Sequence, residues 1–492
     1  MMRTTLKTAA LLGAILFGLM AAEPIRLHPK NPHYFLFRGN AVALVTSGEH
    51  YGSVINGAID YKRYLAALAS DGMNYTRIFG GTYVEVPAQS FGIHRNNLAP
   101  GPGRFIAPWA RSETPGYAGG GNQFDLDRWN PEYFGRLHDF LSEASRLGIV
   151  VEVSLFSSHY MEAHWKLSPF NAANNVNATS SIDWKKLHTL DNGNILAHQE
   201  RYTRKLVQEA NGFDNVIFEI QNEPWSDRTV LANVVNPYLP LPDRDRYPNS
   251  IDVADEASMA WQAQVAKWIT SEEATLHNRH LIAQNYGNFG FPVRALAPGV
   301  SIVNFHYAYP SAVALNYGLG LAISCDETGF RGNGDAAYRR EAWSFMLAGG
   351  SIFDSLDYSF TAGHEDGSDT EANGPGGGSP QLRRQLRILS ESLKSLPLAD
   401  MAPDASVVQH APGVYAHVLS APSGRYAMYF DGRGPVEVTL DLPAGQYAGG
   451  WVDTQTGSVE KGQPIQHRGG PLTLQSPAFE DGIALFLNRA AK

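Results

Sequence analysis

Between about residues 35 and 400, continuous apolar runs alternate with segments in which apolar residues recur every three or four positions. The runs are rich in Val, Ile, Leu and Phe, which is typical of strands that are buried on both faces. We expect eight such strands, at Ala41–Ser47, Asn74–Phe79, Ile149–Phe156, Asn215–Gln221, His280–Asn285, Ser301–Tyr307, Leu321–Asp326 and Ser351–Tyr358.

Helical patterns separate most of these strands. Two predicted helices show an apolar face, formed by Tyr61, Tyr64, Leu65 and Leu68 in the first and by Leu382, Leu386, Leu389 and Leu393 in the second. The pattern is weakest in the fifth and sixth connections, and Tyr286–Gly299 contains little of it. Eight strands with intervening helices predict an α/β fold of the (β/α)8 barrel type.

Three of the connections are long: Gly80–Arg128, Trp225–Val253 and Thr361–Pro380. Each follows a strand, so each should lie on the carboxyl-end face, where barrel active sites are found. The first contains Trp109 and Tyr117 and is expected to shape the pocket, either by blocking one end or as a lid over an open cleft. The last is rich in Gly, Asp and Glu, and is either a mobile lid or an exposed, disordered insertion.

After about Met401 the pattern changes to short apolar runs separated by Gly and Pro turns. This pattern is typical of a small all-β sandwich. We therefore expect a barrel domain over residues 23–402 and a sandwich over 403–492, which either binds glycan or braces the barrel.

The N-terminus has the three parts of an export signal. Arg3 and Lys7 precede an apolar run that is followed by Ala21-Ala22. The run is too short for a comfortable membrane-spanning helix. A signal peptide over residues 1–22 is expected, and with it a periplasmic or secreted protein. Cys325 is the only cysteine, so no intrachain disulfide is possible.

Charge narrows the class of partner. The 492 residues carry a formal net charge of −9, which argues against nucleic-acid binding because such proteins usually present a basic face. Neutral polymers such as polysaccharides remain open as partners. The 9 Trp, 22 Tyr and 23 Phe suit either sugar stacking or core packing. The sequence contains no signal for an oligomeric state.

The strongest chemical signal is the stretch that runs from Asn215 through a predicted buried strand into Asn222-Glu223-Pro224. Pro224 cannot donate to a strand ladder, so it helps to end the strand and leaves Glu223 at its tip. A second predicted strand ends in Glu327, which precedes the turn residue Gly329. Glycoside hydrolysis requires two such carboxyl groups on either side of the bond that breaks.

These motifs resemble those of the clan A glycoside hydrolases, whose barrel has an acid/base Glu after an Asn on strand four and a nucleophilic Glu on strand seven. Asn222-Glu223 and Glu327 match those positions. The resemblance further implies that Arg77 on strand two supports the nucleophile and that His306-Tyr307 ends strand six in the site. It also implies that His159 and Tyr160 end strand three, where the clan often has sugar-binding residues. It is nearest to cellulase-like family 5 members and to apiosidase-like barrels, which often carry a C-terminal β module labelled collagen-binding-like.

One departure from this family concerns strand eight, which ends in Trp in many members and here in Asp357-Tyr358. Tyr358 is therefore a candidate for substrate binding in place of that Trp. At the end of strand one, Glu49-His50 either binds sugar or supports the barrel.

The residue types themselves suggest roles for the other candidates. Arg77 would keep Glu327 ionised by Coulomb attraction, and Tyr307 can donate a hydrogen bond to Glu327. Asn222 can bind a sugar 2-hydroxyl, and the negative charge of Glu327 would favour the protonated form of Glu223.

Metal and cofactor motifs are missing from the sequence. It contains no His-Glu-x-x-His motif, no Cys/His zinc spacing, no phosphate-binding loop and no dinucleotide fingerprint. The acidic segment His364–Asp369 has oxygen ligands but not the twelve-residue calcium loop pattern. We expect no metal and no cofactor.

The function predicted from the sequence is an exported retaining glycoside hydrolase, with Glu223 as acid/base and Glu327 as nucleophile. It would act on a β-linked bond of a plant or microbial glycan. Three alternatives stay open: a non-catalytic carbohydrate-binding barrel, a transglycosylase that uses the same two residues, and a metal-dependent hydrolase on the same fold.

Overall fold

The computed structural model describes residues 23–87, 89–233, 250–371 and 374–490. The predicted signal peptide, residues 1–22, lies outside these ranges. Eight parallel strands form one sheet in the order β4-β15-β14-β13-β12-β9-β8-β5. Their bounds are β4 Leu44–Gly48, β5 Tyr75–Phe79, β8 Val150–Ser157, β9 Val216–Asn222, β12 Leu281–Asn288, β13 Val300–His306, β14 Ala322–Glu327 and β15 Ile352–Leu356.

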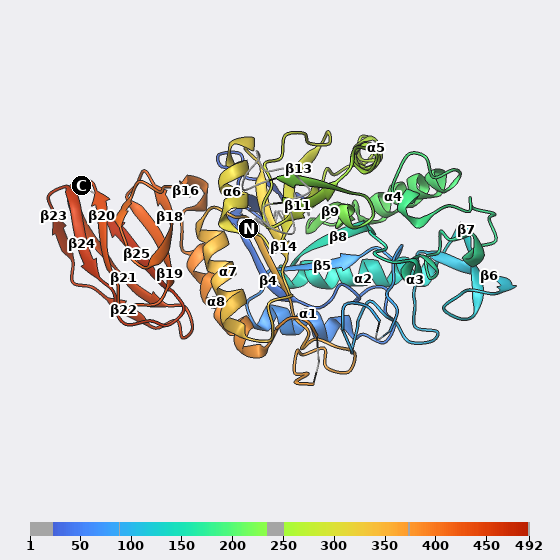
Figure 1. Ribbon diagram of the computed structural model, residues 1–492, viewed down its shortest axis with the longest axis horizontal. Coiled ribbons are helices and arrows are strands. Elements are labelled where there is room, and N and C mark those ends of the chain that lie inside the picture. Colours follow the sequence, from blue (N-terminus) through green and yellow to red (C-terminus); the bar gives the residue numbers. More distant parts are fainter. Residues whose placement is uncertain (1–22, 88, 234–249, 372–373, 491–492) are drawn as a thin grey trace, which may run out of the picture.

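The sheet curls into a nearly closed barrel, which confirms the predicted fold (Figure 1). Its seam lies between β4 and β5. There the Asn74 side chain accepts a hydrogen bond from Val45 N at 2.8 Å and donates one to Ala43 O at 2.9 Å. One amide side chain thus links the two strands that complete the ring.

Helices follow most strands: α1 Tyr61–Ser70, α2 Pro131–Leu147, α3 Glu162–Trp165, α4 Ile195–Ala210, α5 Glu256–Glu273, α6 Pro310–Asn316, α7 Asp335–Leu347 and α8 Pro380–Lys394. The side chain of Asp60 caps α1, and that of Ser379 caps α8, which has Pro380 in its first turn. The two apolar faces expected from the sequence are buried in these two helices. Residues 289–299, all of them described, contain no helix, in agreement with the weak pattern there.

The amino-terminal end of the barrel is covered by a small antiparallel sheet. It consists of β1 Arg26–Leu27, β2 Phe35–Phe37 and β3 Asn40–Val42. Phe35 and Phe37 are buried with Tyr75, Val150 and Ile217, which lie at or near the starts of barrel strands. The long connections lie on the opposite, carboxyl-end face of the barrel.

The connection over Gly80–Arg128 contains a hairpin that the sequence analysis did not predict, β6 Trp109–Pro115 with β7 Asn122–Trp129. The connection lines the inner cavity of the site, as expected, but it does so through residues 83–98, and Trp109 and Tyr117 are not among the lining residues. Trp109 is buried against Phe170, with a ring-centroid distance of 5.0 Å, and Tyr117 packs on Phe124 at 4.9 Å. Both residues are buried because this hairpin packs against residues 167–170 of the connection after β8.

The connection over Trp225–Val253 holds a second hairpin, β10 Thr229–Asn233 with β11 Ser250–Ala254. Its residues 234–249 lie outside the described part of the chain.

In the described part of the acidic connection, residues 361–371 and 374–380, arginines hold several groups in place. Arg63 lies 2.5 Å from Asp366, and Arg95 lies 2.6 Å from Asp369. Arg383 donates to the carbonyl oxygen of Gly367 at 3.1 Å. Because each arginine comes from a different element, this connection is tied to α1, to the loop after β5 and to α8.

The C-terminal part is an all-β structure of two sheets. The strands are β16 Ala402–Pro403, β17 Val408–His410, β18 Val414–Ala421, β19 Arg425–Gly432, β20 Glu437–Leu442, β21 Gly445–Asp453, β22 Val459–Lys461, β23 Ile465–His467, β24 Gly470–Gln475 and β25 Ile483–Arg489. Strands β17, β20 and β24 form one sheet, and the other seven form the second.

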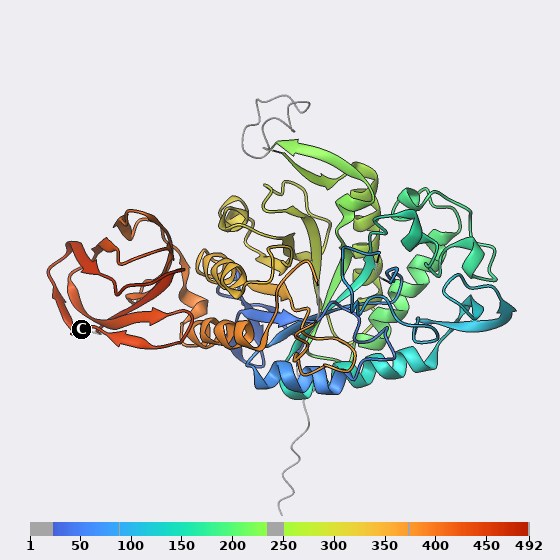
Figure 2. The same ribbon diagram turned by 60° about the horizontal axis from the view of Figure 1, so that its bottom comes forward.

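The larger of these two sheets packs against the barrel through α7. The Trp343 ring stacks on Tyr429 with centroids 5.7 Å apart, and Arg339 forms a 3.0 Å ion pair with Asp481. Figure 2 shows the sheets at one end of the molecule beside the helices, with the β6–β7 hairpin at the other end. The shared apolar contacts make this part a brace on the barrel.

Candidate active site

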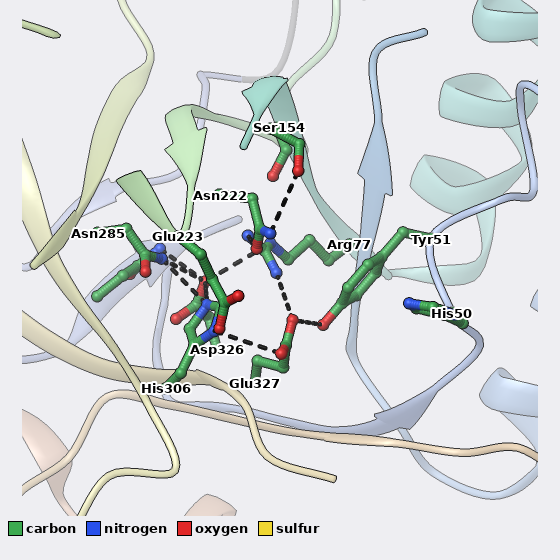
Figure 3. A network of polar contacts seen from close by, with 12 residues as sticks. His50, Tyr51, Arg77, Ser154, Asn222, Glu223, Asn285, His306, Asp326 and Glu327 are labelled. Atoms are coloured by element: carbon green, nitrogen blue, oxygen red, sulfur yellow. Dashed lines mark hydrogen bonds and ion pairs between the residues drawn. The ribbon is translucent and has the colours of Figure 1, made fainter. Parts of the chain in front are cut away.

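Glu223 and Glu327 meet at the carboxyl-end face of the barrel. Glu327 is the last residue of β14, and Glu223 directly follows β9. One ligand oxygen of each carboxylate and a ring nitrogen of His306 lie within 4.8 Å of one another. His306 Nδ1 is 2.8 Å from Glu223 Oε1 and 3.3 Å from Glu327 Oε1 (Figure 3).

The Glu327 carboxylate is buried and surrounded by donors. Arg77 Nη1 lies 3.3 Å from its Oε2, Tyr51 donates to the same oxygen at 2.8 Å, and Tyr307 donates to Oε1 at 3.0 Å. Burial opposes ionisation, but the positive charges of His306 and Arg77 outweigh it and hold the pKa of Glu327 well below its ordinary value. Glu327 is therefore an anion at neutral pH.

His306 is completely buried between carboxylates. Burial alone would lower the pKa of its imidazole, but the negative charges of Glu327 and Asp326 raise the pKa well above its ordinary value. The ring is therefore held as a cation at neutral pH. It places one positive charge between the two catalytic candidates.

Arg77 is fixed by several partners at once. Its Nη2 atom contacts Glu219 at 2.5 Å and Oδ1 of the Asn222 side chain at 2.7 Å, and its guanidinium lies 4.7 Å from the Tyr51 ring centroid. Asn222 in turn donates to the Tyr160 hydroxyl at 2.7 Å. Because the guanidinium of Arg77 has partners on several sides, its orientation toward Glu327 is fixed.

Several side chains of the site are aimed by an unusual backbone conformation. Among the described residues, eight that are not glycine have positive φ, and six of these line the cavities of the site. These six are Tyr51, Phe91, Tyr160, Glu223, Phe289 and Tyr307. Most of them lie one to three residues after a barrel strand. Such residues cost of order 1–3 kcal/mol each and concentrate at functional sites.

Two cavities meet at Glu223. The inner cavity measures about 60 Å³ and is lined by both catalytic candidates together with His50, Tyr51, Glu85 and Asn222, among others. The outer cavity measures about 860 Å³ and is lined by Glu223, Trp225, Phe289 and Tyr309, among others, but not by Glu327. The arrangement can hold a ligand that spans both cavities and passes Glu223.

Of the candidates at the end of the first strand, His50 lines the inner cavity and Glu49 does not. Glu49 accepts hydrogen bonds from Ser53 N and from the Asn97 side chain, both at 2.7 Å. Glu49 therefore holds the adjoining loops in place. This is the supporting role that was one of the two alternatives for Glu49-His50. Tyr358 also lies outside the cavity lining, with its ring edge-on to His50 at 6.0 Å.

His159 is placed away from the inner cavity, which corrects its position in the predicted site. Its ring is buried edge-on to Trp165 at 5.6 Å and to Tyr83 at 5.6 Å. The next residue, Tyr160, has a φ of 54° and lines both cavities instead. The reversal of the chain at this point turns the second of the two residues toward the site.

Sequence analysis missed Tyr51, Glu85 and Glu219. Glu219 lies on β9, four residues before Glu223, so strand alternation could have placed it inside the barrel below the site. Tyr51 and Glu85 lie in connections, and no periodic signal marks them.

Two groups of side chains in the described ranges have donor atoms close enough to hold a cation: Glu223, His306 and Glu327, and deeper in the barrel Glu152, Glu219 and Asp326. The first group already receives hydrogen bonds from Tyr51 and Tyr307. The second group accepts from Tyr75, Arg77 and Asn304. That the protein needs no metal stays a prediction.

Among the residues that the structure describes, no helix is both long and apolar enough to cross a membrane.

Comparison with known proteins relates the chain to glycoside hydrolases through its structure. No protein-family model and no curated protein sequence matches it. A solved glycoside hydrolase superposes with a TM-score of 0.62 at 11% identity, covering 96% of this chain and 98% of the other. A glycoside hydrolase family 5 protein from Bacteroides vulgatus ATCC 8482 gives a TM-score of 0.62 at 11% identity, covering 95% and 93%. At such identity the likeness shows a common fold.

Proposed function

We propose that the protein is an exported retaining glycoside hydrolase that cleaves a β-linked bond of a plant or microbial glycan by double displacement. The observation that carries this proposal is the closeness of Glu223 and Glu327: one oxygen of each lies within 4.8 Å of the other, and His306 Nδ1 contacts both, at 2.8 and 3.3 Å. Retaining pairs are about 5–5.5 Å apart, whereas inverting pairs are about 6.5–9.5 Å apart to admit a water molecule. Residues 1–22, with their signal-like pattern, support export.

In the first step, Glu327 attacks the anomeric carbon and forms a covalent glycosyl ester. Its low pKa supports this role, because a nucleophile must be ionised when the substrate arrives. Tyr51 and Tyr307 hold the two carboxylate oxygens from different sides, at 2.8 and 3.0 Å. These bonds restrict the rotation of the carboxylate and so keep one orientation for the attack.

At the same time Glu223 protonates the departing glycosidic oxygen. The His306 N–H bond at 2.8 Å engages Oε1, which leaves Oε2 to carry the transferred proton. In the second step the Glu223 carboxylate takes a proton from water, the water oxygen attacks the anomeric carbon, and Glu327 departs as a carboxylate. The net change is the addition of one water molecule across the glycosidic bond.

Two further observations support the proposal. The solved structures with the same fold include proteins named as glycoside hydrolases. Asn222 is held by Arg77 and by the Tyr160 hydroxyl beside Glu223, where an amide can bind the 2-hydroxyl of a sugar.

The test is a panel of aryl β-glycosides, with proton NMR of the first anomer released. We expect hydrolysis of at least one glycoside with retained configuration. Glu327→Gln should abolish turnover while the melting temperature is preserved. Glu480→Gln, which changes an exposed carboxylate of the C-terminal sheets, is the matched control and should keep full activity. An inverted first product, or full activity of Glu327→Gln, would contradict the proposal.

The three alternatives have different outcomes in the same assay. A transglycosylase would give sugar-transfer products when a second glycan is added. A non-catalytic binding barrel would bind glycans without hydrolysis. A metal-dependent hydrolase would lose activity after treatment with a strong chelator, whereas we expect activity to survive.

A further inference from the structure

The two cavities divide a bound substrate into unequal parts. Both catalytic candidates line the inner cavity, but only Glu223 lines the outer one. The nucleophile must contact the sugar whose anomeric carbon reacts, and the acid must contact the oxygen that leaves. The reacting sugar therefore belongs in the inner cavity and the leaving group in the outer cavity. This assignment rests on the proposed function.

The inner cavity has room for one small unit. Its volume of about 60 Å³ is far below the 300–1,000 Å³ that is typical of sites for drug-sized ligands. It corresponds to about five water positions, at roughly 10–15 Å³ each. The outer cavity, at about 860 Å³, has space for several sugars or for another large group. Three of its aromatic side chains, Phe289, Tyr309 and Phe330, are 40–47% exposed and offer flat apolar faces.

Four residues of the connection after β5 line the inner cavity and not the outer one. These residues, here called the wall, are Tyr83, Glu85, Ile93 and Leu98. All four are buried. The segment folds back on itself, since Glu85 N donates to Leu98 O at 2.8 Å.

The wall is anchored to the rest of the barrel. The Asn97 side chain donates to Glu49 at 2.7 Å and to the carbonyl of Phe360 at 3.0 Å. Arg95 pairs with Asp369 of the acidic connection at 2.6 Å. These contacts reach two other barrel connections, so the wall is part of the folded site rather than a lid over an open cleft.

Polar groups are buried where the cavity ends. Glu85 is 3% exposed, accepts a hydrogen bond from Tyr83 at 3.2 Å, and lies 3.8 Å from His50 Nε2. Nδ1 of His50 is buried and has no hydrogen-bond partner among the described residues. A buried polar atom without a partner is costly, and a ligand hydroxyl would supply the missing bond. A carboxylate and an imidazole together can accept from and donate to sugar hydroxyls.

We propose that the enzyme removes single sugars from the non-reducing end of its substrate, and that Glu85 and His50 hydrogen-bond the free hydroxyls that mark this terminal sugar. In an internal sugar, one of these hydroxyls is replaced by the link to the preceding unit. That unit would have to occupy the space of Ile93 and Leu98. The wall therefore excludes cleavage of internal bonds. The hydrogen bonds to the free hydroxyls select the bond of the terminal sugar.

Product analysis tests this mode of action. The substrate is a hexasaccharide of the sugar accepted as an aryl glycoside, labelled at its reducing end. We expect the free monosaccharide and the labelled pentasaccharide as the first products, followed by a ladder that shortens one unit at a time. Early release of shorter labelled fragments would overturn the proposal while leaving hydrolysis itself intact. Failure to hydrolyse any glycoside would instead overturn the proposed function, and this inference with it.

The role of Glu85 is tested by Glu85→Gln, which keeps the side-chain volume. We expect kcat/KM on the aryl glycoside to fall about 10²-fold, since a buried bond to a charged group is lost. Glu113→Gln, an exposed carboxylate on the same connection, is the matched control and should not change kcat/KM.

A deoxygenated substrate separates recognition from a merely structural role. Aryl glycosides that lack one hydroxyl at a time are compared in the wild type and in Glu85→Gln. For the hydroxyl that Glu85 binds, the two proteins should turn over the deoxy analogue at equal rates. If Glu85→Gln lowers turnover of every analogue by the same factor, or of none, the assignment of Glu85 is wrong. The melting temperature of each variant shows whether it is folded.

Discussion

His306 holds Glu223 through its Nδ1 atom at 2.8 Å, and the same nitrogen is 3.3 Å from the carboxylate of Glu327. Two carboxylates, to which the proposed mechanism gives different tasks, thus share one buried positive charge. Their other neighbours differ, because Arg77 and Tyr51 both contact Glu327.

Replacement of His306 by Asn should move the acidic limb of the kcat/KM profile to higher pH. His306 and Arg77 hold the pKa of Glu327 well below its ordinary value against the effect of burial. Loss of one of these charges raises that pKa, so a smaller fraction of Glu327 is ionised at a given acidic pH. The measurement is kcat/KM against pH on an aryl glycoside. His410→Asn, an exposed histidine in the C-terminal sheets, is the control. An unchanged acidic limb would contradict the role assigned to His306.

Glu223→Gln should affect substrates according to their leaving groups. Proton donation is worth about 10²–10⁴-fold when the leaving group is a poor one, such as a sugar. A dinitrophenolate leaves without a proton, so the first step should survive on that substrate. Rates of the first step with the two kinds of substrate give the comparison. Equal losses on both would show that Glu223 is not the acid.

Asp354→Asn should stabilise the protein increasingly as the pH rises above about 4. Asp354 is buried on β15, and burial, partly offset by Arg77, raises its pKa well above the ordinary value. The unfolded chain is ionised above pH 4 while the folded chain keeps the proton. The wild type therefore loses stability with rising pH, up to the folded-state pKa.

Asn cannot titrate, so the difference in unfolding free energy should grow by up to about 1.4 kcal/mol per pH unit in this window. Denaturant unfolding of both proteins at pH 4, 5.5 and 7 measures it. Parallel curves for Asp354→Asn and the wild type would refute the prediction.

Trp343→Ala should weaken the attachment of the C-terminal sheets to the barrel. Trp343 is fully buried, and its ring stacks on Tyr429. Truncation of a buried Trp costs about 3–5 kcal/mol. Calorimetry should show a lower melting temperature, with the transition of the C-terminal sheets separating from that of the barrel. Val459→Ala, an exposed apolar residue on β22, should leave the transition in place.

The barrel could be predicted from the sequence because strands that are buried on both faces consist of continuous apolar runs. All eight strands were predicted within a few residues of their bounds. The sequence was also sufficient for Glu223 and Glu327, because each stands where a run ends. The hairpin β6–β7 was missed because its strands are partly exposed and lack a continuous run.

The remaining parts of the site depend on geometry that a strand pattern does not encode. Tyr160 rather than His159 lines the cavities, since the chain turns left-handed at Tyr160. Glu85 is placed by side-chain hydrogen bonds from Asn96 and Tyr83 in a connection without regular structure. Such contacts follow from the folded loop and have no periodic trace in the sequence.

The left-handed residues at the strand ends have a consequence for how this site can change. The strain at such a position comes from the backbone and is similar for most unbranched side chains, at about 1–2 kcal/mol. Exchange of one aromatic residue for another at Phe289, or at Phe91 in the connection after β5, would therefore alter the cavity lining with little change in the free energy of folding. The aromatic residues that line the cavities could then be exchanged one at a time, and the sugar specificity of the site would change with them. Arg77, His306 and the two carboxylates would stay unchanged.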